Sequence, residues 1–203
     1  MIYLFSLLPY TRCFISLSMN MPFIILDRDG VINYDSDEYI KSPDEWIPIP
    51  GSLKAIAKLN QAGFKIVIAT NQSGIARGLY SLKTLNEIHE KLKSSVRAEG
   101  GEIEAIFFCP HHPDDGCGCR KPKPGMLYDI EKQFSVRLDE TFFIGDSIVD
   151  YQAAVIVGCQ PLMVKTGKWQ KALEINPAIN DCPHFLDLAQ AAQYVIKHMK
   201  RKG

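Results

Sequence analysis

The sequence predicts a single α/β domain in which a parallel sheet lies between two layers of helices. Five short runs are apolar throughout, without the alternation of a half-exposed strand, and amphipathic helical patterns stand between several of them. Strands that are apolar on both faces are typical of parallel sheets covered on each side by helices. The chain of 203 residues has room for one such domain and hardly for two.

The predicted elements follow one another in the order that a parallel sheet requires. Strands are expected at 23–27, 65–70, 104–109, 141–146 and 160–164. A first helix, with apolar residues at positions 53, 56, 57 and 59, should end at Gly63. Ser81 should cap a second helix, which has apolar residues at 82, 85, 88 and 92. A last amphipathic helix is predicted over about 186–197.

The N-terminal 18 residues are apolar but fit neither a membrane anchor nor a signal peptide well. Pro9 and Arg12 interrupt the stretch, no basic region precedes it, and it is too short to span a bilayer. We expect residues 1–21 to be a disordered extension or the product of an upstream start codon. A cleaved signal and a peripheral anchor are the alternatives. The predicted domain covers residues 22–203.

The composition gives no sign of a nucleic-acid or membrane partner. Lys plus Arg and Asp plus Glu each number 23, so the chain lacks the basic field of most nucleic-acid binders. Three of the six cysteines stand close together beside two histidines, which favours metal binding in a reducing compartment over disulfides. We expect a cytoplasmic protein and a monomer.

Polar residues stand where several predicted strands end. Asp27 and Asp29 follow the first strand, and Thr70 ends the second. Asp146 ends the fourth strand, while Lys121 follows the third after a long loop. Because the carboxyl ends of parallel strands line one crevice, these side chains should converge there.

Such a group fits Mg²⁺-dependent phosphoryl transfer. The carboxylates of Asp27, Asp29 and Asp146 would repel one another without a cation between them, and hard oxygen ligands favour Mg²⁺. Lys121 and Thr70 supply a positive charge and a hydrogen-bond donor for a phosphoryl group. A carboxylate can then attack phosphorus to form an aspartyl-phosphate, while Asp29 protonates the leaving alkoxide and later activates water.

These motifs resemble the haloacid dehalogenase superfamily from about Pro22 to Val164. The matching residues are Asp27, Asp29 and Val31 in the first motif, Thr70 in the second, Lys121 in the third, and Gly145, Asp146 and Asp150 in the fourth. The resemblance implies a three-layer, Rossmann-like domain. It also implies that Asp27 is the nucleophile and Asp29 the general acid/base, with Thr70 and Lys121 completing the catalytic set. Mg²⁺ would be held by Asp27, by Asp146 and by Asp29 through its backbone carbonyl.

The segments between the motifs leave no room for a separate cap domain. Residues 30–51 contain only a short excursion, and residues 70–121 have room for one helix, one strand and a loop. We therefore expect a site that is open to solvent and admits a substrate whose far end projects outward.

A cluster of four soft or borderline ligands predicts a structural zinc site beside the third motif. The ligands are Cys109, His111, Cys117 and Cys119, in the pattern C-x-H-x₅-C-x-C. Zinc would fix a loop that has no core of its own and that ends at Arg120 and Lys121. For this cluster, reduced core cysteines and a catalytic zinc are the less favoured alternatives. For the chain, a zinc-ribbon nucleic-acid module and a receiver domain are less favoured. The phosphorylated Asp of a receiver domain would follow the third strand.

Within the superfamily the chain is similar to phosphatases that remove the 7-phosphate of D-glycero-D-manno-heptose 1,7-bisphosphate. The similarity rests on TNQSGIARG at 70–78, CPHHP at 109–113 and CRKPKPGM at 119–126. It implies a role in ADP-heptose and lipopolysaccharide-core synthesis. The implied substrate contacts are Asp35, Tyr39, Thr70, Asn71, Gln72, Ser73, Arg120 and Lys121, with Arg120 on a second, non-reacting phosphate.

Histidinol-phosphate phosphatases share the zinc ligands and are the alternative. The short zinc loop and a one-residue insertion at 35–39 both lie where substrates should be discriminated.

Overall fold

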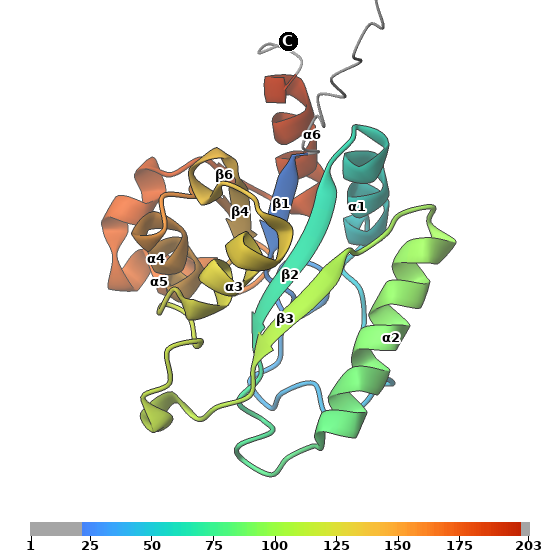
Figure 1. Cartoon of the computed structure of the whole chain (residues 1–203), viewed down its shortest axis with the longest axis vertical. Coiled ribbons are helices and arrows are strands. Elements are labelled where there is room, and N and C mark those ends of the chain that lie inside the picture. Colours follow the sequence, from blue (N-terminus) through green and yellow to red (C-terminus); the bar gives the residue numbers. More distant parts are fainter. Residues whose placement is uncertain (1–21, 200–203) are drawn as a thin grey trace, which may run out of the picture.

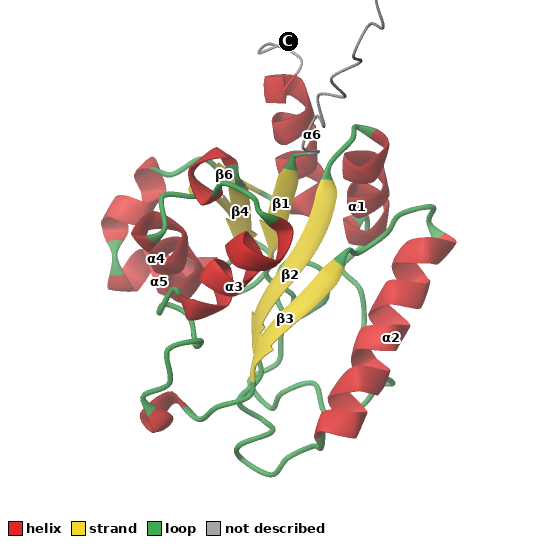
Figure 2. Ribbon diagram, in the orientation of Figure 1, coloured by secondary structure: helices red, strands yellow, loops and turns green. Residues whose placement is uncertain are grey.

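A six-stranded parallel sheet forms the centre of the domain, with helices on both faces (Figures 1 and 2). The computed structural model describes residues 22–199, so the predicted extension at 1–21 lies outside the described residues. The strands are β1 (Phe23–Leu26), β2 (Lys65–Asn71), β3 (Ala105–Cys109), β4 (Phe142–Gly145), β5 (Gln160–Val164) and β6 (His184–Phe185). Their order across the sheet is β3-β2-β1-β4-β5-β6, and all paired strands are parallel. The predicted parallel α/β fold is confirmed.

Two hydrophobic cores fill the space between the sheet and its helical layers. The helices are α1 (Ser52–Gln61), α2 (Leu82–Ala98), α3 (Gly125–Phe134), α4 (Ile148–Ile156), α5 (Trp169–Ile175) and α6 (Leu188–Met199). One core packs α1, α2 and α6 on one face of the sheet, the other packs α3 and α4 on the opposite face, and a smaller third cluster packs α5 against β5. In β1, Ile24 and Leu26 enter the first core, while Phe23 and Ile25 enter the second. Because both faces are buried, the strand is apolar without alternation.

The five predicted strands all occur, with each end within one residue of the predicted position. Ser81 caps α2 as predicted, since its hydroxyl oxygen accepts a hydrogen bond from the Thr84 backbone N at 3.1 Å. The sequence pattern did not predict β6, α3, α4 or α5. A two-residue strand shows no periodicity, and α4 and α5 are shorter than the helices that were predicted, whereas α3 is as long as α1.

The connections on the carboxyl side of the sheet decide how open the site is. Between β1 and α1 the chain forms turns and isolated bridges, in which Asn33 pairs with Asp29 and Pro48. Between β2 and β3 the only helix is α2, and residues 22–199 contain no second sheet that could form a cap.

Within the same residues, no helix is both long and apolar enough to cross a membrane.

Candidate active site

The carboxyl ends of β1, β2 and β4 open into a cavity of about 390 Å³. This cavity brings together every predicted catalytic, substrate-binding and magnesium-binding residue, in agreement with the strand-end rule. These residues are Asp27, Asp29, Asp35, Tyr39, Thr70, Asn71, Gln72, Ser73, Arg120, Lys121 and Asp146. Asp150, at the start of α4, lines the same cavity.

Three buried carboxylates and one buried amine form the deepest part of the cavity. Asp27, Asp146 and Asp150 have carboxylate oxygens within 4.8 Å of one another. Lys121 places Nζ 2.8 Å from Oδ1 of Asp27 and 2.5 Å from Oδ1 of Asp150, and it also donates to the Ala69 carbonyl at 2.7 Å. Lys121 therefore pairs with two of the three carboxylates, and the negative charge that remains is sufficient to bind a divalent cation.

The pKa shifts in this cluster have the same origin. Burial raises the pKa of Asp27 to about 7, with Lys121 opposing the shift and Asp150 adding to it. Burial and the nearby charges of Asp150 and Asp27 raise the pKa of Asp146 well above its usual range. Lys121 alone does not compensate the buried negative charge, and oxygen donors of this kind suit Mg²⁺.

Asp146 is held against the backbone of two loops. The Lys168 backbone N donates to Asp146 Oδ2 at 2.6 Å. A Cβ atom at either Gly30 or Gly167 would overlap the Asp146 carboxylate. Glycine is therefore required at both positions for the backbone to approach this carboxylate so closely.

The Asp29 carboxylate lies outside that cluster and accepts four hydrogen bonds. Arg28 donates from Nε to Oδ1 at 3.0 Å and from Nη2 to Oδ2 at 2.9 Å. Asn33 donates to Oδ1 at 2.8 Å, and Gln72 donates to Oδ2 at 2.9 Å. Burial would raise the pKa of Asp29, but the Arg28 charge and these hydrogen bonds outweigh it and lower the pKa. The side chain is thus separate from the candidate metal ligands, as a group that transfers protons should be.

The side chains of several predicted substrate contacts already bind other parts of the site. Asn71 exchanges two hydrogen bonds with the Lys121 backbone, each 3.1 Å long, and so fixes Lys121 against β2. Asp35 forms an ion pair with Lys168 Nζ at 2.8 Å. Tyr39 has a φ of 66°, which non-glycine residues rarely adopt outside turns and functional sites. Their contacts with substrate stay predictions.

Behind Asp29 lie three buried polar residues that were not predicted from the sequence: Arg28, His89 and Tyr80. Arg28 Nη1 lies 3.3 Å from His89 Nε2, and the Tyr80 hydroxyl donates to Gln72 Oε1 at 2.6 Å. A signal for His89 exists, because it stands four residues after Leu85 and so lies on the apolar face of α2. A titratable residue on that face must be buried.

His89→Gln is expected to reduce the acid sensitivity of the fold. Burial, with help from the Arg28 charge, lowers the pKa of His89 from 6.5 to about 3. Below pH 6.5 the unfolded chain therefore binds a proton that the folded protein does not bind, and stability decreases. From about pH 7 to about pH 5, wild type should lose about 2 kcal/mol more unfolding free energy than the variant. Urea unfolding at both pH values checks this, and equal losses would contradict a buried, neutral His89.

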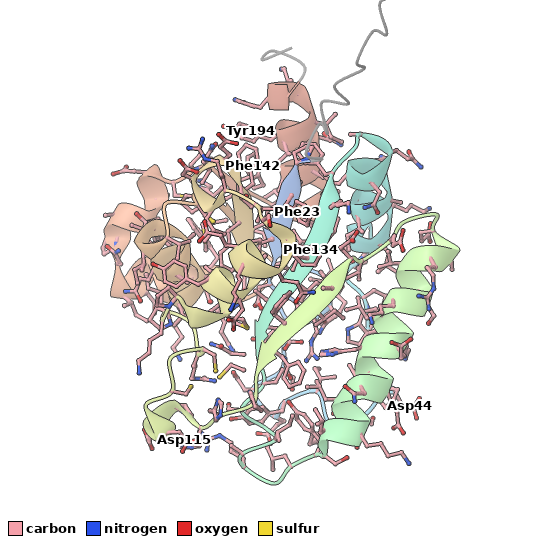
Figure 3. The ribbon with its side chains drawn as sticks, in the orientation of Figure 1. Phe23, Asp44, Asp115, Phe134, Phe142 and Tyr194 are labelled. Carbon is pink, nitrogen blue, oxygen red and sulfur yellow. The ribbon has the colours of Figure 1, made fainter. Side chains whose placement is uncertain are left out.

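The four predicted zinc ligands converge in the loop between β3 and α3, whose far end carries Asp115 in Figure 3. His111 Nδ1 lies 3.6 Å from Cys109 Sγ and 3.3 Å from Cys119 Sγ. The sulfur–sulfur distances among Cys109, Cys117 and Cys119 are 3.3 to 3.6 Å. Tetrahedral Zn²⁺ with Zn–S bonds of about 2.3 Å separates its sulfur ligands by about 3.8 Å. The four atoms therefore have nearly the spacing that zinc requires.

A family model described as haloacid dehalogenase-like hydrolase matches residues 21–158. The chain belongs to this family. Its fold and its strand-end carboxylates are those expected for the superfamily, so the enzyme class is a hydrolase.

Two curated relatives share more than half of their aligned residues with this hydrolase. A Pseudomonas aeruginosa protein is 53% identical over 179 residues, which cover 88% of this chain and 100% of the relative. A Bordetella bronchiseptica protein is 56% identical over 177 residues, which cover 87% and 99%. Both are named D-glycero-β-D-manno-heptose-1,7-bisphosphate 7-phosphatase.

Two solved structures of heptose 1,7-bisphosphate phosphatases are also similar to this chain. The D,D-heptose 1,7-bisphosphate phosphatase of B. bronchiseptica, complexed with magnesium and phosphate, matches with a TM-score of 0.85 and 50% identity. The match covers 88% of this chain and 99% of that structure. The corresponding enzyme of Burkholderia thailandensis matches with a TM-score of 0.68 and 38% identity, over 86% of this chain and 98% of that one.

Proposed function

We propose that this hydrolase is a Mg²⁺-dependent phosphatase that removes the 7-phosphate of D-glycero-β-D-manno-heptose 1,7-bisphosphate. The observation that carries the proposal is the buried cluster of Asp27, Asp146 and Asp150 around Lys121. Relatives at 53% and 56% identity that carry the name of this activity support the choice of substrate. A phosphorylated sugar is thus the proposed partner.

Mg²⁺ is proposed to bind Asp27 and Asp146, with Asp150 beside them and the Asp29 backbone carbonyl as a further ligand. Burial, and after it the neighbouring carboxylates, raise the pKa values of Asp27 and Asp146, and a cation bound between them would relieve both effects. When bound, Mg²⁺ would neutralise the carboxylates and withdraw charge from the phosphate oxygens.

The proposed first step transfers the phosphoryl group to Asp27. A carboxylate oxygen of Asp27 attacks phosphorus, an O–P bond forms, and the bond from phosphorus to the sugar oxygen breaks. The negative charge of the bound phosphate would favour the protonated form of Asp29, which gives its proton to the leaving sugar oxygen. Lys121 and the Thr70 hydroxyl bind the phosphoryl oxygens, in a cavity where burial strengthens such electrostatic contacts.

The proposed second step releases phosphate and restores the enzyme. Asp29 accepts a proton from water, the water oxygen attacks phosphorus, and the bond between phosphorus and Asp27 breaks. Inorganic phosphate leaves, and Asp27 is a free carboxylate again. One residue thus serves as acid in the first step and as base in the second.

We propose that Cys109, His111, Cys117 and Cys119 hold a structural Zn²⁺. All four ligand positions are protein atoms, so none is open for a substrate. The loop that they would fix contains only a short 3₁₀ turn and leads directly into Arg120 and Lys121. Zinc would therefore position these two cations without taking part in the reaction.

Arg120 favours a bisphosphate over histidinol phosphate. Its Nη1 atom is buried, and within residues 22–199 it has no hydrogen-bond acceptor. Lys168 and Lys171 line the same cavity. A second phosphate would pair with the Arg120 guanidinium, which the positively charged amine of histidinol phosphate cannot do.

The test compares three substrates on one preparation: the heptose 1,7-bisphosphate, the heptose 7-phosphate and histidinol phosphate. We expect the highest specificity constant for the bisphosphate. Arg120→Met should lower that constant by about 10- to 100-fold, because it removes a charge-assisted contact. The same variant should change the constant for the 7-monophosphate far less. A higher wild-type constant for histidinol phosphate would overturn the proposed substrate.

A further inference from the structure

Arg28 is a buried cation whose only acidic partner among the described residues is its neighbour Asp29. It is fully buried, and two of its donors form the paired contact with both Asp29 oxygens. This fork matches a carboxylate in its plane and therefore fixes the orientation of the carboxylate as well as its position.

His89 holds the far side of the same guanidinium. Arg28 can only donate, so His89 Nε2, at 3.3 Å, must accept, and the ring must be neutral with its proton on Nδ1. The low pKa of His89 agrees with this state. The ring also packs edge-on against Phe108 of β3, with centroids 5.9 Å apart. Helix α2 is thus connected through His89 and Arg28 to Asp29.

Gln72 and Tyr80 hold Asp29 from another direction. Gln72 Nε2 donates to Asp29, and Tyr80 donates to Gln72 Oε1, which determines which way the Gln72 amide points. With the Asn33 contact, both Asp29 oxygens accept two hydrogen bonds each. A carboxylate with two oxygens has about four acceptor positions, so its orientation is determined in this state, and the proton it transfers must replace one of these four donors.

We propose that Arg28 and His89 are positioning residues, which hold the Asp29 carboxylate in the orientation that proton transfer requires. The proposal rests on the role given to Asp29 in the proposed function. Neither residue touches the reacting atoms, and His89 acts only through Arg28.

A purely stabilising role explains this arrangement less well. Arg28 and Asp29 are adjacent in the chain, so their ion pair joins no distant parts of the fold. Removing an ion pair from water costs free energy that the pair often does not recover. The single long-range contact of Arg28 in this network is the one to His89, which is uncharged. What the network does achieve is one fixed direction for the Asp29 carboxylate, which lines the cavity.

The experiment uses His89→Leu, which removes the acceptor, and His89→Gln, which can restore it through the amide oxygen. Ile88→Val, at a buried position of α2 in the hydrophobic core, is the control for a loosened helix. Each variant is assayed with the heptose bisphosphate in the steady state and with p-nitrophenyl phosphate by rapid mixing. The p-nitrophenolate ion is a weak base and leaves without a proton, so its first-turnover burst does not need an acid.

His89→Leu should lower the turnover of the heptose bisphosphate by about 10²-fold, the loss typical of a misplaced catalytic group. The first-turnover burst with p-nitrophenyl phosphate should keep the wild-type rate, because Asp27 and Lys121 are untouched. His89→Gln should recover most of the lost turnover, and Ile88→Val should lower only the melting temperature. If His89→Leu fails to fold, Arg28→Lys takes its place, because it keeps the positive charge but loses the paired contact with Asp29. It should likewise lower the turnover of the heptose bisphosphate and leave the rate of the p-nitrophenyl phosphate burst unchanged.

A burst that slows as much as the sugar turnover would overturn the proposal, because the network would then support the whole site. Full sugar turnover in both His89→Leu and Arg28→Lys would overturn it as well. Asp29→Asn separates this from the wider proposal. If Asp29→Asn also keeps full turnover, the proposed function of Asp29 fails; if Asp29→Asn is slow while the positioning variants are fast, only this inference fails.

Discussion

Asp27→Asn is expected to abolish phosphatase turnover, with a loss on the order of 10⁴-fold or more, as for other nucleophiles that act within a catalytic unit. The amide of asparagine cannot form the O–P bond that the first step requires. The substitution is nearly isosteric, and Lys121 keeps Asp150 as a partner, so the surroundings should stay in place. Steady-state turnover of the heptose bisphosphate and detection of an acid-stable phosphoenzyme are the measurements.

The stability of the same variant provides an independent check. Burial raises the pKa of Asp27 to about 7 from 3.8, so at neutral pH the folded state pays a penalty for its negative charge. The neutral amide removes that penalty, and metal-free Asp27→Asn should melt no lower than wild type. The rise in melting temperature on adding Mg²⁺ should shrink, because one candidate ligand is gone.

The matched control is Asp139→Asn, which changes an exposed carboxylate whose only ion pair among residues 22–199 is with Arg137. It should keep both the turnover and the Mg²⁺-dependent rise in melting temperature. Appreciable residual turnover in Asp27→Asn, with no slow deamidation to aspartate on mass spectrometry, would argue against the covalent route.

The strands that are buried on both faces could be predicted from the sequence. Apolar runs marked five strands to within one residue, because both faces of each central strand are covered. β6 could not be predicted in this way, since His184 and Phe185 are too few to show a pattern and pair only with the end of β5. The position of such a strand is set by its neighbours.

The residues around the reaction centre could be predicted because they stand at strand ends, where chain position determines spatial position. Asp27, Thr70 and Asp146 each follow this rule. Arg28 and His89 do not, because their meeting depends on how α2 packs against the sheet. An arginine between two aspartates looks like a surface residue in the sequence, yet it is fully buried.

Cys117→Ser is expected to remove the zinc and to destabilise the loop that carries Arg120 and Lys121. Structural zinc contributes about 10–16 kcal/mol of binding free energy in zinc-finger peptides, and only part of it should be lost here because the sheet remains. A loss of a few kcal/mol would lower the melting temperature by on the order of 10 °C in a domain of this size. Elemental analysis and thermal unfolding are the measurements.

The kinetic result distinguishes a structural zinc from a catalytic one. Turnover by Cys117→Ser should fall because Arg120 and Lys121 are misplaced, and its Mg²⁺ dependence should remain. Cys182→Ser is the matched control, since Cys182 lies outside the cluster and donates to the Pro161 carbonyl, as a serine hydroxyl also can. It should keep its zinc and its turnover. If Cys117→Ser instead kept the wild-type melting temperature and lost its Mg²⁺ dependence, the zinc would belong to the reaction rather than to the loop.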